Sequence, residues 1–200
     1  MMRVVFIGLV ASMFLAASAS ASPTVGQLAR VFSAVDSNGA TRSLAQFKGK
    51  TVVLEWTNNG CPYTRKHYES GNMQRLQQEA TASGVVWLSV ISSAPGKEGY
   101  VTGSEANDLT ASRFAHPSAV LLDPTGVVGR AYEAQTTPHM FVIDKAGVLR
   151  YMGAIDDHPV ASPASLAGAR NYVREALGAL AAGKPVAVAS TEPYGCSVKY

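Results

Sequence analysis

The sequence predicts a three-layer α/β domain with a central mixed sheet. Two buried apolar strands, at 51–56 and 84–91, flank a helical stretch from Pro62 to about Ala80. Strand, helix and strand in this order form a parallel βαβ unit. A β-hairpin at 139–153 and a last helix follow it. The 200 residues are enough for one such domain with its own apolar core.

The first 22 residues are typical of a secretory signal peptide. Arg3 supplies the positive charge, an apolar run follows, and small residues offer cleavage sites after Ala19 or Ala21. An uncleaved membrane anchor is the alternative, but the apolar run is short for a spanning helix. We therefore expect export, with the periplasm as the compartment, and no stable membrane insertion after cleavage.

The elements before the second strand have clear local signals. Asn38-Gly39 between alternating apolar residues predicts a hairpin ahead of the first buried strand. Proline suits the first position of the helix that begins at Pro62, because its missing N–H needs no partner there. Gly71 inside that helix predicts a kink or a split.

The second half of the chain predicts the remaining elements. Ser104 is the expected N-cap of a short helix over 104–115, and a third strand covers 118–123. A brief helix or turn follows that strand. The last helix is expected over 162–183, where apolar residues recur at helical spacing. The α/β domain is thus placed at 23–183, and residues 184–200 form a tail without helical period.

Composition excludes one class of function and draws attention to the cysteines. The formal net charge is +3, but basic residues form no stripe, so nucleic acid is not an expected partner. The two cysteines, Cys61 and Cys196, are too few for a disulfide-stapled scaffold. In an oxidising compartment they either join each other or remain as two free thiols.

The order of elements, with a cysteine opening the first long helix, resembles the thioredoxin fold. Four stretches carry the resemblance: "LEWTNNGCP" at the strand-to-helix turn, "TTPHMFVID" around Pro138 at the family's cis-proline, "DKAGVLRYMGAID" at the next hairpin, and "SNGATRSLAQFKGKTVVLEW" at the N-terminal hairpin. The last is similar to the exported redoxin or AhpC/TSA branch, which includes peroxiredoxin-like and TlpA-like proteins. The resemblance implies a thioredoxin fold with an N-terminal β-hairpin extension, thiol oxidoreductase activity and no bound cofactor.

The chain departs from the signatures of these families at two points. The C-x-x-C motif becomes C-P-Y-T, which leaves Thr64 in place of the second cysteine. The peroxiredoxin motif has a threonine three residues before its cysteine, where this chain has Asn58, and Thr57 is one residue too early. A peroxide and a protein disulfide therefore both stay open as substrates.

Cys61 is the expected nucleophile. At a helix N-terminus, unpaired N–H groups and the helix dipole stabilise a thiolate, and Arg65 and Lys66 can add positive potential. A buried structural cysteine is the alternative, but a glycine before it and a proline after it argue against that. The Thr64 hydroxyl either bonds the thiolate or fills an exposed position, and the sequence favours neither.

The resemblance implies further groups at the site. Glu55 aligns with an acidic position beneath the sulfur, where burial would raise its pKa and let it relay a proton. An exposed glutamate at the edge of the sheet is the alternative. Thr137 and Pro138 would face the cysteine, with the backbone of Thr137 pairing with an incoming peptide or thiol partner. His139 is expected to be packed or solvated rather than to act as a ligand.

Two other polar stretches are expected to lie on the surface. His67 is six residues from Cys61 and off its helical face, so we predict a solvated histidine. Asp156-Asp157-His158 has residue types that suit a metal, but no second cluster accompanies it. A plain surface loop is therefore the prediction for 156–158.

Cys196 is the expected resolving cysteine. At roughly 3.3 Å per extended residue, the tail is long enough to cross the domain and reach the active-site end. The alternatives are an incidental thiol on a frayed end and a structural disulfide. We expect Cys196 to pair with Cys61 in one redox state, which an external thiol reductant reverses. A non-enzymatic metal-binding module that uses Cys61 and His139 is the rival function.

Overall fold

The computed structural model describes residues 22–200, so the expected signal peptide lies outside the described residues except for Ser22. The strands are β1 (Ser33–Asp36), β2 (Thr41–Ser43), β3 (Val52–Trp56), β4 (Val86–Ile91), β5 (Ala119–Leu122), β6 (Thr136–Thr137), β7 (His139–Ile143), β8 (Leu149–Gly153) and β9 (Cys196–Ser197). The helices are α1 (Pro62–Glu69), α2 (Asn72–Ala82), α3 (Gly103–Ser112), α4 (Val127–Ala131) and α5 (Tyr172–Ala181), with short 3-10 turns η1 (Leu44–Phe47) and η2 (Pro163–Leu166).

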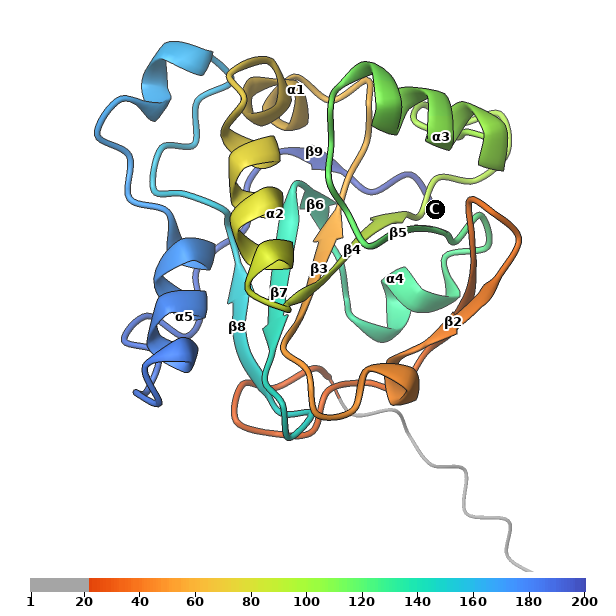
Figure 1. Ribbon diagram of the computed structural model, residues 1–200. Coiled ribbons are helices and arrows are strands. Elements are labelled where there is room, and N and C mark those ends of the chain that lie inside the picture. The colour runs from red at the N-terminus through yellow and green to blue at the C-terminus, as the bar shows by residue number, and fades with distance from the viewer. Residues whose placement is uncertain (1–21) are drawn as a thin grey trace, which may run out of the picture.

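Seven strands form one mixed sheet in the order β2-β1-β5-β4-β3-β7-β8 (Figure 1). β3 and β4 are parallel, with Leu54 opposite Leu88, and β5 continues parallel to β4. β7 pairs antiparallel with β3, and β8 pairs antiparallel with β7. The β1–β2 hairpin joins the sheet through β5. The predicted thioredoxin fold with an N-terminal hairpin extension is therefore confirmed.

Apolar side chains pack in two main layers, one on each face of the sheet. β3 and β4 alternate between these layers, as a period of two requires. Trp56 lies with Tyr132 and Phe141 in the layer beneath α4. Trp87 lies with Met140 in the layer beneath α2 and α5. The three-layer arrangement follows from this double coverage.

The long helix predicted from Pro62 is split at Gly71. This glycine adopts a left-handed backbone with φ of +71°, which ends the hydrogen-bond ladder of α1 and starts α2 in a new direction. Ser70 closes α1 through its N–H to the Lys66 carbonyl. The predicted split is therefore confirmed.

Two predicted helix starts are wrong. Thr102, not Ser104, is the N-cap of α3, because its hydroxyl accepts from the N–H of Glu105 while that carboxylate bonds back to the Thr102 N–H at 2.7 Å. The last helix begins at Tyr172, because Asn171 caps it through the N–H of Arg174 at 2.9 Å. The stretch before Asn171 holds only the turn η2.

The tail runs along one edge of the sheet and then crosses the active-site end. The N–H of Thr191 donates to the Met152 carbonyl on β8 at 3.1 Å. Farther on, β9 pairs antiparallel with β6, with Cys196 opposite Thr137. Figure 1 shows β9 passing below α1 toward β6. Within residues 22–200, no helix combines the length and the apolarity that a membrane span requires.

Candidate functional site

The loop between β3 and α1 has a defined shape. The Asn58 side chain accepts from the N–H of Gly60 at 2.8 Å and donates to the Glu98 carbonyl at 3.3 Å. The Asn58 carbonyl in turn accepts from the N–H of Cys61 at 3.2 Å. These bonds form an Asx turn that delivers Cys61 to the N-cap of α1.

Cys61 is fully buried and faces the loop before β7. Its thiol donates to the Thr137 carbonyl at 3.0 Å. The Thr137–Pro138 peptide bond is cis, as the resemblance implies. The two segments that the sequence places at the site, 57–61 and 136–138, therefore meet in space.

Cys196 reaches the same place from the end of the chain. β9 sets it opposite Thr137, whose carbonyl accepts the Cys61 thiol. Both cysteines are free thiols, and Cys196 is partly exposed. Strand pairing thus brings to the site a second cysteine that lies 135 positions after the first in the sequence.

The two thiols have opposite pKa shifts. Burial alone would raise the pKa of Cys61, but weak hydrogen-bonding interactions from the Cys196 side chain, the Thr64 backbone and the Thr137 side chain lower it below its ordinary value. Burial raises the pKa of Cys196, and the neighbouring Cys61 raises it further. The arrangement favours a thiolate on Cys61 and a protonated thiol on Cys196.

Thr64 and Arg65 lie beside Cys61 in different ways than expected. Thr64 is buried, its backbone rather than its hydroxyl acts on Cys61, and the hydroxyl has no hydrogen-bond partner within residues 22–200. Thr64 is the third residue of α1, and an N–H in the first turn of a helix has no partner within the helix. The Thr64 N–H can therefore point toward Cys61 at the N-cap, which explains why the backbone rather than the hydroxyl acts on the sulfur. Arg65 is exposed and pairs with Glu69 at 2.9 Å, so its charge is directed to that carboxylate.

Glu55 is fully buried on β3 and is surrounded by donors. Its carboxylate accepts from Trp87 Nε1 and the Tyr68 hydroxyl, each at 2.8 Å, and from Gln77 and Ser89, each at 3.0 Å. Burial raises its pKa, and these hydrogen bonds offset only part of the rise. The exposed alternative is therefore wrong. Within the described chain, no hydrogen bond joins Glu55 to Cys61.

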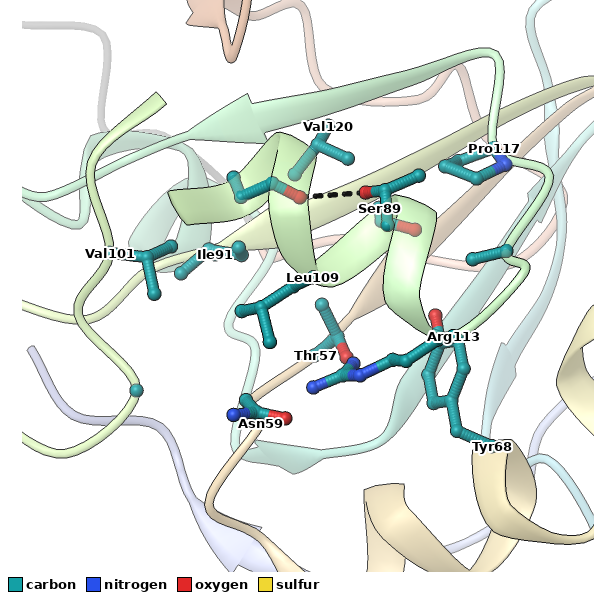
Figure 2. Close-up of a pocket in the computed structure, with 14 residues that line it drawn as sticks. Thr57, Asn59, Tyr68, Ser89, Ile91, Val101, Leu109, Arg113, Pro117 and Val120 are labelled. Carbon is teal, nitrogen blue, oxygen red and sulfur yellow. Dashed lines mark hydrogen bonds between the residues drawn. The ribbon is translucent and has the colours of Figure 1, made fainter. Parts of the chain in front are cut away.

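The neighbours of Glu55 border a pocket between α3 and the sheet. Figure 2 shows Tyr68, Ser89 and Arg113 in its lining. The Arg113 guanidinium lies over the Tyr68 ring, 4.7 Å from its centroid. Thr57 also lines it, and its hydroxyl has no hydrogen-bond partner among residues 22–200. The Glu55 carboxyl is thus linked through Tyr68 and Ser89 to this pocket rather than straight to the sulfur.

A buried charged cluster forms around Lys66 of α1. Lys66 is fully buried, and its Nζ lies 3.1 Å from Asp156 Oδ2 and 2.6 Å from the His158 carbonyl. His67 is also fully buried, with Nε2 at 3.7 Å from the same carboxylate oxygen. Tyr194 completes the cluster by donating to Asp156 and accepting from Lys66 at 3.1 Å.

This cluster corrects two predictions. His67 is not solvated, and burial, with Lys66 adding to the effect, lowers its pKa to about 4, although Asp156 raises it. Asp156 is not part of a plain surface loop, since it is 2 % exposed. A buried ion pair 90 positions apart has no local signal, because the same residues are usually solvated.

His139 is packed, as expected. It is 5 % exposed, its ring lies 4.5 Å from that of Phe141, and burial lowers its pKa to about 4. Its Nδ1 accepts from the N–H of Gln135 at 3.3 Å. Within residues 22–200, no group of three or more His, Cys, Asp or Glu side chains is placed to hold a metal ion. This geometry does not favour the metal-binding alternative for Cys61 and His139.

Comparison with solved structures supports the fold. A conserved protein of uncharacterised function from Geobacillus kaustophilus superposes with a TM-score of 0.73 at 23% identity, over 88% of this chain and 92% of that one. A hypothetical protein from Sinorhizobium meliloti gives 0.72 at 23% identity, over 90% and 96%. The thioredoxin domain of a thiol-disulfide oxidoreductase from Bacteroides vulgatus gives 0.50 at 21% identity, over 64% and 86%.

Comparison of sequences gives the family. No curated protein shows significant similarity to the chain. The family model of AhpC/TSA matches residues 25–152, which include the Cys61 loop and the cis-proline but not the tail. The match spans more than half of the sequence, and the fold and the cysteine at the start of α1 agree with it. The chain therefore belongs to the AhpC/TSA family of the thioredoxin-like superfamily.

Proposed function

We propose that the protein is an exported thiol oxidoreductase in which Cys61 is the nucleophile and Cys196 is the resolving cysteine. The observation that carries the proposal is the shared partner: Thr137 accepts the Cys61 thiol at 3.0 Å and pairs in register with Cys196. The opposite pKa shifts of the two thiols support this division of roles.

Reduction of a protein disulfide fits this site best, because β6 already pairs with the extended backbone of β9, and the backbone of a partner can pair in the same way. The Cys61 thiolate attacks one sulfur, forms a mixed disulfide and releases the other sulfur as a thiolate. Cys196 then attacks the Cys61 sulfur of the mixed disulfide. The Cys61–Cys196 bond forms, the bond between Cys61 and the partner's sulfur breaks, and the proton of Cys196 passes to that departing sulfur. The partner gains two electrons, which an external thiol reductant later returns to the protein.

A peroxide is the second candidate, and it follows from the family. The Cys61 thiolate attacks one peroxide oxygen, and the other oxygen leaves as water or an alcohol after protonation. Cys196 then attacks the resulting sulfenic acid, which releases water and forms the same disulfide. Both candidates end on one product, so the first experiment is common to both.

The remaining site residues have supporting roles in this proposal. Thr137 and the cis Pro138 present the backbone edge to the partner. The Thr64 backbone stabilises the thiolate, whereas the charge of Arg65 is exposed to solvent and paired with Glu69. Glu55, whose pKa is raised by burial, is linked through Tyr68 and Ser89 to the pocket of Figure 2, where it can exchange a proton.

The test is to oxidise the reduced protein with one equivalent of hydrogen peroxide or of an oxidised dithiol peptide and to map the product by mass spectrometry. We expect a Cys61–Cys196 disulfide that thioredoxin reverses. The Cys196→Ser variant should stop at a sulfenic acid or a mixed disulfide on Cys61, whereas Ser197→Ala should behave as the parent does. Identical oxidation and recovery in Cys196→Ser would rule out the resolving role.

A further inference from the structure

The proposed thiol site is covered by the protein's own tail. β9 occupies the edge of β6, and the N–H of Val198 donates to the Gln135 carbonyl at 2.9 Å. Under this cover Cys61 has no exposed surface. A polypeptide partner therefore has no path to the Cys61 sulfur, and no free edge on β6, while β9 is in place.

The tail is attached in two parts, upstream to the edge of the main sheet and downstream to β6 and the loops beside it. Upstream, the Thr191 hydroxyl accepts from the N–H of Ala154 at 2.9 Å, and its own N–H bonds to Met152 on β8. Downstream, the β6–β9 ladder contains only two residue pairs, and so short a ladder is marginal by itself. The end of the tail adds three contacts: the N–H of Ala94 donates to the Lys199 carbonyl at 2.8 Å, the Tyr200 hydroxyl donates to the Ala134 carbonyl at 2.9 Å, and the Arg130 guanidinium lies 4.5 Å from the Tyr200 ring. None of these partners belongs to a strand of the seven-stranded sheet, so the segment after Thr191 can detach while that sheet stays intact.

Tyr194 links this segment to α1, but the buried cluster on α1 does not depend on Tyr194 to pair its charges. Its hydroxyl bonds to Asp156 and Lys66, and its ring packs edge-on against Tyr63 at 5.8 Å. If Tyr194 leaves, Lys66 keeps its ion pair with Asp156 and its bond to the His158 carbonyl. An unpaired buried charge would be costly, and detachment of Tyr194 leaves none in this cluster.

We propose that residues 193–200 form a displaceable strap, and that an extended, cysteine-containing segment of the partner protein takes its place on β6. This inference rests on the proposed function of Cys61. The partner's cysteine then lies where Cys196 lies now, opposite Thr137. Because the strap pairs with β6 as a β-strand, a partner segment that replaces it must also be extended.

The return of the strap joins two steps into one movement. After the mixed disulfide forms, the strap pairs with β6 again and expels the partner's segment from that edge. The same movement brings Cys196 to the mixed disulfide. The bond between Cys61 and the partner breaks, the Cys61–Cys196 bond forms, and the proton of Cys196 passes to the partner's sulfur.

Gly195 offers a way to loosen the strap while keeping both cysteines. It has a φ of +134°, and a Cβ built there would lie 2.1 Å from the Thr137 carbonyl oxygen. Gly195→Ala should therefore lift the strap from β6 and raise the open population by about tenfold or more. Gly178→Ala is the matched control, because a Cβ on this helical glycine meets nothing within 4 Å.

The probe is a peptide with the tail's own sequence, Tyr-Gly-Cys-Ser-Val, whose cysteine carries a thionitrobenzoate group. Attack by Cys61 on the peptide's cysteine releases coloured thionitrobenzoate and reports capture. Later release of the free peptide, followed by mass spectrometry, reports resolution. Tyr194→Phe serves as a second strap variant in case Gly195→Ala folds poorly.

We expect Gly195→Ala and Tyr194→Phe to speed capture and to slow peptide release, with Gly195→Ala changing each by about tenfold and Gly178→Ala changing neither. Faster capture together with slower release is expected if one segment both blocks the peptide from Cys61 and displaces it after the mixed disulfide has formed. Two rates that change together, or not at all, would overturn the strap.

A separate measurement distinguishes failure of the strap from failure of the thiol chemistry. In the Cys196→Ser background, we follow alkylation of Cys61 by a bulky polyethylene glycol maleimide. Faster alkylation in Gly195→Ala, with no capture of the peptide by any variant, would support the strap and reject the disulfide reductase function. Equal alkylation in Gly195→Ala, Tyr194→Phe and Gly178→Ala would reject the strap itself.

Discussion

Replacing Lys66 with methionine removes the charge of a fully buried side chain and keeps most of its apolar stem. The Nζ to Asp156 Oδ2 distance is 3.1 Å, and the two side chains are 0% and 1% exposed, so solvent screens the pair little. At an effective dielectric constant near 20, this distance corresponds to about 5 kcal/mol of attraction. Breaking a buried pair by removing one partner typically costs about 3–5 kcal/mol. We therefore expect Lys66→Met to lower the free energy of unfolding by about 4 kcal/mol.

Urea unfolding of the reduced protein at pH 7 measures this loss, and three comparisons sharpen it. Arg65→Met removes the exposed neighbouring pair with Glu69 and should cost less than about 1 kcal/mol. Adding Asp156→Asn to Lys66→Met should recover at least half of the loss, because no buried charge is then left alone. The pKa of His67 should rise above about 4, since Lys66 helps to lower it. A loss in Lys66→Met no larger than that in Arg65→Met would refute the reasoning.

Substitutions at three further positions test other parts of the molecule. Glu55→Ala leaves four buried donors without their acceptor and should cost about 3 kcal/mol in urea unfolding. The pKa of Glu55 is higher in the folded protein than in the unfolded chain, so the unfolded chain loses this proton first as the pH increases. The free energy of unfolding of the parent should therefore fall, relative to that of Glu55→Gln, from about pH 4 upward. Cys196→Ala should raise the pKa of Cys61, seen as a shift of the iodoacetamide rate profile to higher pH; an unchanged profile would show that Cys196 doesn't stabilise the thiolate. Gly129→Ala places a Cβ 2.5 Å from the Tyr200 ring and should cost about 1–3 kcal/mol, whereas an unchanged unfolding curve would mean that Tyr200 moves aside freely.

Local patterns predicted the parts of the structure that depend on neighbours in the sequence. The apolar runs of β3 and β4 and the turn at Asn38-Gly39 each occur where predicted, because periodicity and turn chemistry are local properties. The position of Cys61 at a helix start follows from Pro62 in the same way. The N-cap of α3 was predicted at Ser104 and lies at Thr102, because both residue types are good caps and the sequence does not decide between them.

The parts that the sequence did not predict depend on contacts between distant segments. Lys66 and Asp156 look like ordinary surface residues, and only the packing of α1 against the segment after β8 buries them together. The length of the tail predicted that Cys196 can reach the site. Its register opposite Thr137 could not be predicted, because a two-residue ladder has no alternating pattern to set it.

The hydrogen bond from Trp87 Nε1 to Glu55, at 2.8 Å, gives the protein an internal optical reporter. The chain has two tryptophans, and the other, Trp56, bonds to Ser92 in the opposite layer. The emission of an indole responds to a charge placed beside its N–H, so ionisation of the Glu55 carboxyl should alter Trp87 fluorescence and leave Trp56 almost unaffected. In a Trp56→Phe variant, a simple fluorescence titration should therefore read the charge on one carboxyl at the centre of the sheet, without any added label.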